Sequence, residues 1–218
     1  MEKNFQRVTG SQIAQVLLDI EAVLLSPNKP FTWASGIKSP IYCDNRLILS
    51  HPRERTVVEE ALAGAIQEHY PQAEAILGTA TAGIPHASIV AHLLDLPGGF
   101  IRSKAKDHGT GKKVEGAFRP GQKVVVVEDL LSTGGSSIEA AQSARKEGLE
   151  VLGVAALFTY ELKESREKFQ EAKLDYHALA TFTDLTQVAL KRGLLDEKHL
   201  EALARWRENP RDEAWILE

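Results

Sequence analysis

The residues best suited to do chemistry in this chain lie in one short stretch that follows four valines. Two adjacent carboxylates, Glu128 and Asp129, precede Leu130 and Leu131 and then a run of hydroxyls and glycines, Ser132-Thr133-Gly134-Gly135-Ser136. Glycines let backbone N–H groups approach a phosphate closely, and a helix that begins there adds partial positive charge. Because carboxylates repel phosphate, we expect the acidic pair to hold ribose hydroxyls or a bound Mg²⁺. The stretch therefore predicts a site for a phosphorylated sugar.

The flanking segments predict how this stretch is held in place. Val124 to Val127 form an apolar run that is typical of a strand buried on both faces in a parallel sheet. Apolar residues at helical spacing follow from Ile138 to Lys146, and Gly148 suits the position just past a helix end. A strand, the acidic pair, a phosphate-binding turn and a helix would then follow one another. The alternative is an ordinary strand–turn–helix unit in which the glycines serve only the turn.

A second segment carries several cations. Residues 102–113 contain few apolar side chains, and Arg102, Lys106 and His108 could contact a negatively charged leaving group. Two glycines in the segment give the backbone freedom that a closing lid needs. Closure would exclude water and strengthen each charge contact. The alternative interpretation is a solvated surface loop.

Four motifs together resemble those of the type I phosphoribosyltransferases, which bind 5-phosphoribosyl 1-pyrophosphate (PRPP). The acidic pair and the turn after it resemble the PRPP motif of that family. Residues 100–109 resemble the catalytic loop of the orotate phosphoribosyltransferases, and residues 31–42 resemble their N-terminal substrate segment. Residues 78–85 resemble their pyrophosphate-binding loop. The resemblance covers roughly residues 10 to 185, with all motifs in the family's order.

The resemblance implies a role for each motif. The catalytic residues would be Lys106, Arg102, His108 and Asp129, and Lys106 matches the catalytic lysine of the loop. The PRPP-binding residues would be Arg102, Lys106, His108, Glu128, Asp129, Leu130, Leu131, Ser132, Thr133, Gly134, Gly135 and Ser136. Ser132 matches a hydroxyl position that also touches orotate, which makes it the candidate orotate-binding residue.

The resemblance also implies a cofactor and a partner. Mg²⁺ would bridge pyrophosphate oxygens and ribose hydroxyls, and no side chain is assigned to it directly. The catalytic loop would reach the active site of the neighbouring subunit, so a homodimer with shared sites is expected. Some family members carry basic residues at the positions of Ala34, Ser103 and Tyr160. Lys38 and Lys104 are nearby candidates to supply that charge.

The activity implied is the reversible transfer of phosphoribose from PRPP to N1 of orotate. The products would be orotidine 5′-monophosphate and pyrophosphate, in de novo pyrimidine (UMP) biosynthesis. Two alternatives stay open. One is a phosphoribosyltransferase for another base, such as adenine or xanthine, against which only residues 31–42 argue. The other is a PRPP-sensing regulator that binds DNA, for which the opening nine residues offer too little chain for an added domain.

Composition is that expected of a soluble enzyme. The chain has 218 residues, with 26 basic against 30 acidic side chains and a net charge of −4, which gives no support to nucleic-acid or membrane binding. Cys43 is the single cysteine, which excludes an intramolecular disulfide, and we interpret it as a packing residue. The sequence has neither an apolar run of about 18 residues nor a signal-peptide pattern, so a cytoplasmic location is expected.

Strand and helix patterns alternate along the chain, which predicts an α/β fold with a mostly parallel central sheet flanked by helices. We expect a single domain over residues 1–218, with residues about 1–50 forming a small N-terminal hood over the base. Residues 31–49 are expected to be irregular, and their aromatic side chains could be core residues or part of that hood. The expected strands are 75–78, 98–102, 123–127, 151–158 and 178–182. The expected helices are 9–25, 51–69, 84–94, 136–147, 184–191 and 196–208.

Overall fold

The central sheet of the computed structural model has six strands in the order β10-β9-β8-β5-β6-β7. The structure describes residues 5–33, 35–104 and 112–217. β7 lies at one edge and is antiparallel to its neighbour, whereas the other strands of this sheet are parallel. The strands are β5 (Ala75–Thr79), β6 (Gly98–Ile101), β7 (Val114–Glu115), β8 (Lys123–Leu131), β9 (Glu150–Thr159) and β10 (Tyr176–Thr181). The predicted mostly parallel sheet is confirmed.

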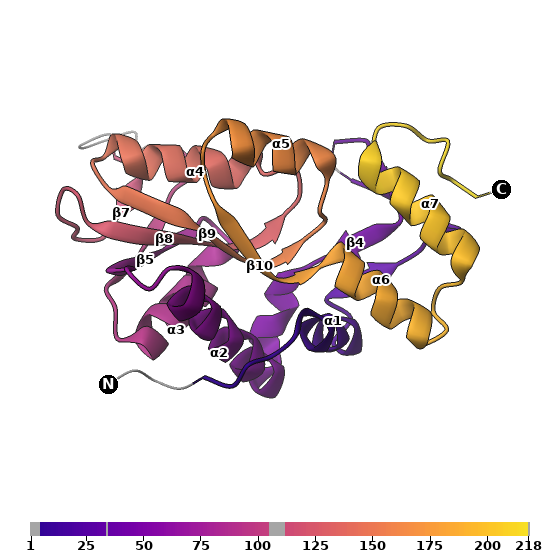
Figure 1. The fold of residues 1–218 in the computed structure, drawn as a ribbon, viewed down its shortest axis with the longest axis horizontal. Coiled ribbons are helices and arrows are strands. Elements are labelled where there is room, and N and C mark those ends of the chain that lie inside the picture. The colour runs from indigo at the N-terminus through magenta and orange to yellow at the C-terminus, as the bar shows by residue number, and fades with distance from the viewer. Residues whose placement is uncertain (1–4, 34, 105–111, 218) are drawn as a thin grey trace.

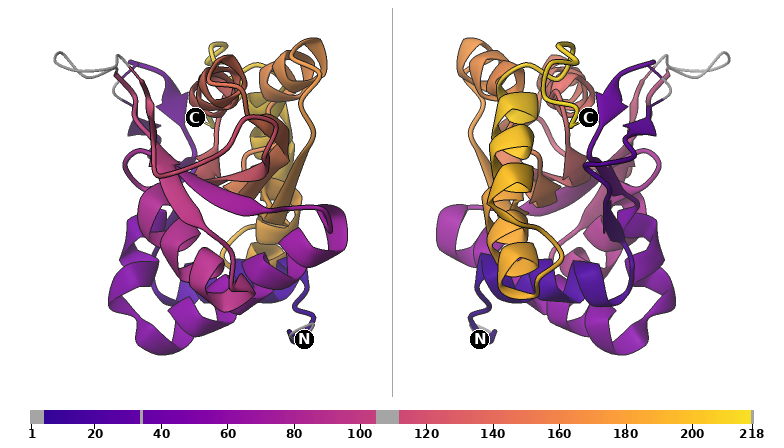
Figure 2. Two further views of the ribbon diagram at one scale, coloured as in Figure 1. Left: turned by 90° about the vertical axis from the view of Figure 1, so that its left-hand side faces the viewer. Right: turned by 90° about the vertical axis from the view of Figure 1, so that its right-hand side faces the viewer.

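Helices cover both faces of this sheet (Figure 1). In that view α4 and α5 lie above the sheet, and α2 and α3 lie below it. Turning the molecule by 90° shows the same two layers on opposite sides of the strands (Figure 2). The α-helices are α1 (Gly10–Asp19), α2 (Pro52–His69), α3 (Gly83–Leu94), α4 (Gly135–Lys146), α5 (Lys163–Glu171), α6 (Phe182–Lys191) and α7 (Glu197–Glu208).

The four valines of β8 are fully buried, at 0% exposure, because both faces of the strand are covered. Val124 and Val126 belong to a hydrophobic cluster with residues of α4, whereas Val125 and Val127 belong to one with residues of α1, α2 and α3. Successive side chains of a strand point to opposite faces. Alternate valines therefore pack into two separate layers, which confirms the predicted burial on both faces.

The N-terminal helix begins where its sequence predicts and ends earlier. Thr9 is the N-cap of α1, and its Oγ1 accepts a hydrogen bond from the backbone N–H of Gln12 at 3.2 Å. The predicted helix 9–25 is wrong at its C-terminal end. α1 stops at Asp19, and Val23–Leu25 forms β1 instead. β1 pairs with β4 (Ile41–Cys43), a partner distant in the sequence that local helical spacing could not reveal.

The segment before α2 holds short paired strands, although irregular structure is expected there. β2 (Phe31–Thr32) pairs with β3 (Lys38–Ser39), and the 3-10 helix η1 (Asn45–Ser50) leads into α2. The indole N–H of Trp206 in α7 donates a hydrogen bond to the carbonyl oxygen of Lys38 at 3.2 Å. The C-terminal helix therefore packs on the N-terminal segment, and a hood made of residues 1–50 stays a prediction.

β8 is longer than predicted and runs to Leu131, so the acidic pair lies inside the strand rather than after it. The register with β9 explains this difference, because Glu128 pairs with Ala156 and Leu130 with Phe158. Pairing with a neighbouring strand overrides a polar local sequence. The sequence pattern does not indicate α5 or β7, whereas the bounds of the remaining predicted elements agree with the structure within two residues.

Candidate active site

The predicted sugar-phosphate motif lies at the carboxyl end of β8, beside the carboxyl end of β5. β5 and β8 are paired and parallel, so the chain segments that leave them emerge at the same edge of the sheet. Ser132, Thr133 and Gly134 form the turn after β8, and α4 begins at Gly135. The predicted succession of a strand, a turn and a helix is found, but the acidic pair lies inside the strand rather than between the strand and the turn. In parallel sheets this edge is where ligands bind.

Glu128 is the buried member of the acidic pair, at 6% exposure. Its Oε1 accepts hydrogen bonds from Thr79 Oγ1 at 2.6 Å and from the Asp129 N–H at 3.2 Å. Its Oε2 accepts from Ser137 Oγ at 2.8 Å. Burial raises the pKa of Glu128 to about 7, the bonds from Thr79 and Ser137 oppose this shift, and the like charge of Asp129 adds to it. Glu128 thus carries its proton at neutral pH far more than an exposed glutamate does.

Asp129 is the more accessible member of the pair. It is partly exposed, and its backbone carbonyl accepts a hydrogen bond from Asn45 Nδ2 at 2.6 Å. Its charge is close enough to the N-terminal segment to add to the burial that raises the pKa of Cys43 well above its ordinary value. Asn45 of η1 therefore fixes the strand end from which this carboxylate projects. The protonated Cys43 thiol is consistent with the predicted packing role.

The turn before α4 leaves an open helix N-terminus. Gly134 has a φ of +78°, and a Cβ built on it would lie 2.8 Å from the ring of Phe169. A Cβ on Gly135 would meet no atom within 4 Å. α4 also begins without a side chain that caps its first turn. The first N–H groups of α4 therefore have no side-chain cap, and N–H groups at a helix N-terminus can donate hydrogen bonds to an anion.

These two glycines differ in what a methyl group would do. Gly134→Ala is expected to lower the free energy of unfolding by about 1–3 kcal/mol, because alanine disfavours a positive φ and would press on Phe169. Gly135→Ala should change that free energy by less than about 0.5 kcal/mol. Its methyl group would instead enter the predicted phosphate space and raise the KM for PRPP. Urea titrations measure the stability of both variants, and steady-state kinetics measure the KM of Gly135→Ala. Equal losses of stability in the two variants would contradict this prediction.

The loop that resembles a pyrophosphate-binding loop joins β5 to α3. A Cβ on Gly78 would lie 2.6 Å from the carbonyl oxygen of Gly83, and a Cβ on Gly83 would lie 2.5 Å from Thr79 Oγ1. The two ends of the loop therefore approach each other closely. The Ala80–Thr81 peptide bond between them is cis. This loop emerges next to the carboxyl end of β8, beside the acidic pair.

Arg102 is the first residue after β6, the strand next to β5. Its side chain is 41% exposed, and its Nη1 lies 3.4 Å from Glu115 Oε1 of β7. Because β6 is parallel to β5, the cationic segment leaves the sheet at the same edge as the other candidate residues. Lys106 and His108 lie outside the described residues, so their predicted roles stay predictions.

The aromatic residues of the N-terminal segment divide between core and surface. Trp33 stacks on Tyr160, with ring centroids 5.5 Å apart, and meets Trp206 edge-on at 5.8 Å. Tyr160 is buried, so the position near β9 where some family members carry a basic residue holds a packed ring here. Tyr42, by contrast, is 42% exposed and contacts Phe31. Trp33 is therefore partly buried and packs against the core, and the surface aromatics remain candidates for a base-binding wall.

Sequence reasoning did not single out three residues that the structure places at this site. Thr79, Ser137 and Asn45 each donate a hydrogen bond to the acidic pair. Ser137 directly follows the hydroxyl run, and Thr79 ends an apolar strand within the resembling loop, which are the signals that could have drawn attention to them. Thr79 and Asn45 lie far from the acidic pair in the sequence, and Ser137 belongs to a different element, so only the fold reveals the contacts.

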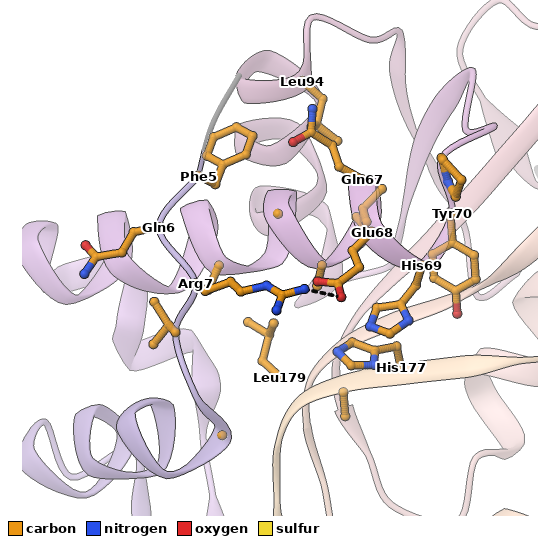
Figure 3. A pocket seen from close by; sticks show the side chains of 18 of the residues that line it. Phe5, Gln6, Arg7, Gln67, Glu68, His69, Tyr70, Leu94, His177 and Leu179 are labelled. Carbon is orange, nitrogen blue, oxygen red and sulfur yellow. Dashed lines mark hydrogen bonds and ion pairs between the residues drawn. The ribbon is translucent and has the colours of Figure 1, made fainter. Parts of the chain in front are cut away.

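A cavity of about 1180 Å³ lies elsewhere, between the N-terminal segment, α2 and β10 (Figure 3). Arg7 and Glu68 form an ion pair at 2.6 Å beside it, and the rings of His69 and His177 stack with centroids 3.8 Å apart. The residues predicted to bind PRPP are absent from its lining. Because it adjoins the amino-terminal part of β10 rather than a strand's carboxyl end, it is not the candidate active site.

The shifted pKa of Glu128 makes stability depend on pH. An unfolded glutamate loses its proton near its ordinary pKa of 4.5, whereas folded Glu128 keeps its proton up to about pH 7. The stabilisation is complete below the unfolded pKa and is lost as pH rises through the folded one, on the order of 3 kcal/mol in all. Glu128→Gln does not titrate there, so its free energy of unfolding should rise relative to wild type from about pH 5 to about pH 8. Urea titrations measure this, and a constant difference would contradict the shift.

Similarity to known proteins identifies the family. The family model described as phosphoribosyl transferase domain matches residues 45–186. An orotate phosphoribosyltransferase of Bacillus cereus is 52% identical over 205 residues, which cover 94% of this chain and 98% of that relative. The chain belongs to the orotate phosphoribosyltransferase family. The resemblance seen in the sequence motifs is thereby confirmed.

Solved structures agree with this family assignment. An orotate phosphoribosyltransferase from Aeropyrum pernix matches with a TM-score of 0.72 at 29% identity, covering 84% of this chain and 99% of that one. The Mycobacterium tuberculosis H37Rv enzyme of the same name, in complex with PRPP, matches with a TM-score of 0.62 at 23% identity over 81% of this chain and 98% of that one. The second likeness concerns the fold alone. The predicted type I phosphoribosyltransferase fold is confirmed.

Two further features bear on cofactors and membranes. Within the described ranges, no three His, Cys, Asp or Glu side chains gather into a group that could hold a metal ion. Across the same part of the chain, no helix is both long and apolar enough to span a bilayer.

Proposed function

We propose that the protein transfers the phosphoribosyl group of PRPP to N1 of orotate, giving orotidine 5′-monophosphate and pyrophosphate on the route to UMP. The observation that carries this proposal is the N-terminus of α4, which has no side-chain cap and begins at Gly135, one short turn after the strand that holds the Glu128–Asp129 pair. This geometry suits a ligand with phosphate at one end and hydroxyls beside it. The 52% identity to an orotate phosphoribosyltransferase of Bacillus cereus supports orotate as the acceptor base.

The 5′-phosphate of PRPP would bind the turn and first turn of α4. Backbone N–H groups at Gly135 and Ser136, with the hydroxyls of Ser132 and Thr133, would donate hydrogen bonds to its oxygens. Leu130 and Leu131 complete the strand end that positions this turn. Asp129 is accessible enough to accept hydrogen bonds from the ribose hydroxyls. Ser132 would also contact orotate.

The chemistry asks mainly for positioning and charge complementarity. When the C1–oxygen bond breaks, positive charge develops on the ribose ring and negative charge on the departing pyrophosphate. Asp129 would stabilise the ring, while Arg102, Lys106 and His108 would stabilise the pyrophosphate. As the bond between C1 and N1 of orotate forms, N1 loses its proton, which the departing pyrophosphate can accept. If the cationic segment closes over the site, it would exclude water, and the activated sugar would then be protected from hydrolysis.

Mg²⁺ is the proposed cofactor. The ion commonly takes few protein ligands and several from substrate phosphates. Pyrophosphate oxygens and ribose hydroxyls would hold it, with the acidic pair supplying negative charge nearby. When bound, Mg²⁺ would neutralise part of the charge on the leaving pyrophosphate.

We extend the proposal to a cytoplasmic homodimer in which the cationic segment of one subunit serves the site of the other. The support is the family's loop arrangement together with the position of Arg102 at the ligand-binding edge of the sheet. Mixing subunits that carry Lys106→Ala with subunits that carry Asp129→Asn tests shared sites. Mixed dimers with one intact site should regain activity that neither variant has alone. Failure of the mixture to regain activity would argue for sites complete within one subunit.

A base-selection assay tests the reaction itself. The purified protein is mixed with PRPP and Mg²⁺ and offered orotate, adenine or xanthine, and pyrophosphate release is followed. We expect release with orotate and little with the purines. Release with a purine and none with orotate would replace the proposed acceptor while keeping the PRPP site.

A further inference from the structure

Three side chains join the two loops that are proposed to bind the phosphates of PRPP. Thr79 ends β5 and lies near the start of the candidate pyrophosphate loop, and Ser137 lies in the first turn of α4, just after the 5′-phosphate turn. Glu128 lies between them, and its two oxygens accept one hydroxyl each, at 2.6 Å from Thr79 and 2.8 Å from Ser137. The bridge is buried, because Thr79, Glu128 and Ser137 are at most 6% exposed.

The bridge fixes both loops to one rigid group. When Glu128 is ionised, each hydroxyl donates its single proton to a different carboxylate oxygen, and turning either hydroxyl away would cost a buried hydrogen bond to a charged group. Thr79 is held further by the close approach of Gly83. A shift of the pyrophosphate loop would therefore move Glu128, and through Ser137 it would move the start of α4.

We propose that Thr79 and Ser137 are positioning residues that couple the two phosphate-binding loops through Glu128. A phosphate bound at the turn before α4 would hold the pyrophosphate loop in its binding position. Pyrophosphate bound at that loop would in the same way hold the turn in its binding position. This inference rests on the proposed function for the assignment of the two loops. PRPP carries phosphate on both sides of its ribose, so such coupling selects a ligand that fills both loops.

Binding measurements with two separate ligands test the coupling. Ribose 5-phosphate probes the turn before α4, and magnesium pyrophosphate probes the other loop. The β-anomer of ribose 5-phosphate leaves the α face of C1 free for pyrophosphate. Calorimetry should show that saturating ribose 5-phosphate tightens pyrophosphate binding to wild type about fivefold or more, a common size for coupling between sites. By linkage, pyrophosphate should tighten ribose 5-phosphate binding by the same factor.

Removing either hydroxyl should remove the coupling and leave most of the binding to each separate loop. In Thr79→Val and Ser137→Ala we expect the coupling factor to fall below about twofold, and the conservative Thr79→Ser and Ser137→Thr should restore it. Ser143→Ala in α4 and Thr186→Val in α6 are the matched controls, because they remove hydroxyl-to-carbonyl hydrogen bonds away from the site. Both controls should keep the wild-type coupling.

The outcomes separate this inference from the proposed function. The proposed coupling would be overturned if wild type showed none. It would also be overturned if Thr79→Val and Ser137→Ala kept the full wild-type coupling. If one variant fails to fold, the other carries the same test, because each removes one of the two hydroxyls that the bridge requires. Coupled binding without turnover of orotate would keep the bridge and contradict the acceptor. Turnover of orotate without coupled binding would support orotate as the acceptor and contradict the coupling through the bridge.

Discussion

Replacing Lys106 with alanine is expected to lower kcat by about a hundredfold or more while the protein stays folded. Lys106 matches the catalytic lysine of the family's loop and would stabilise the charge on departing pyrophosphate. Removing one donor aimed at transition-state charge typically costs about 3 kcal/mol of barrier. Steady-state kinetics with PRPP and orotate measure the loss, and thermal unfolding checks the fold.

The matched control for this variant is Lys198→Ala, which removes an exposed lysine in the first turn of α7. It should keep wild-type turnover, since α7 packs on the N-terminal segment rather than on the turn before α4. Near-normal turnover of Lys106→Ala would contradict the role given to the cationic segment. Turnover reduced equally in both variants would point to a general effect of lost positive charge.

Asp129→Asn is expected to lower kcat/KM for PRPP by roughly 10- to 100-fold. The substitution keeps the shape of the side chain and the backbone contact to Asn45 but removes the negative charge offered to the sugar. A hydrogen bond to a charged group contributes roughly 1.5–3 kcal/mol, which corresponds to a loss of that size. The loss should fall largely on kcat, because the positive charge on the ribose develops in the transition state.

Asp95→Asn provides the control for the loss of one aspartate charge. Asp95 is exposed at the C-cap of α3 with a φ of +56°, a conformation that asparagine also tolerates. Its kinetics should equal those of wild type. An Asp129→Asn enzyme with unchanged kcat and a raised KM alone would mean that this carboxylate binds the substrate equally in both states and does not favour the cationic ring.

The parts of the fold that follow local rules could be predicted from the sequence. The valines of β8 predict a strand that is buried on both faces, as observed. Thr9 caps the start of α1, and Gly148 has a φ of +89° just past the end of α4, as their residue types predict. Each signal depends on neighbours in the chain or on backbone sterics. The succession of a strand, a turn and a helix at the candidate site was predictable for the same reason.

The parts that depend on distant partners could not be predicted in this way. Val23–Leu25 continues the helical spacing of α1 but pairs with β4, and the strand β8 extends through the acidic pair because β9 lies beside it. The bridge from Thr79 to Ser137 joins side chains from separate elements, and hydroxyl residues are too common in sequences to suggest it. Trp33 shows the same limit, since its contact with Tyr160 requires the fold.

A crystal structure with PRPP and Mg²⁺ bound tests most directly where this protein holds its sugar phosphate. The 5′-phosphate is expected at the N-terminus of α4, within hydrogen-bond distance of Thr133 and Gly135. The ribose hydroxyls are expected at Asp129, and the pyrophosphate at the loop after Thr79. PRPP bound away from these residues, for example in the cavity beside His69 and His177, would contradict the site proposed for this chain.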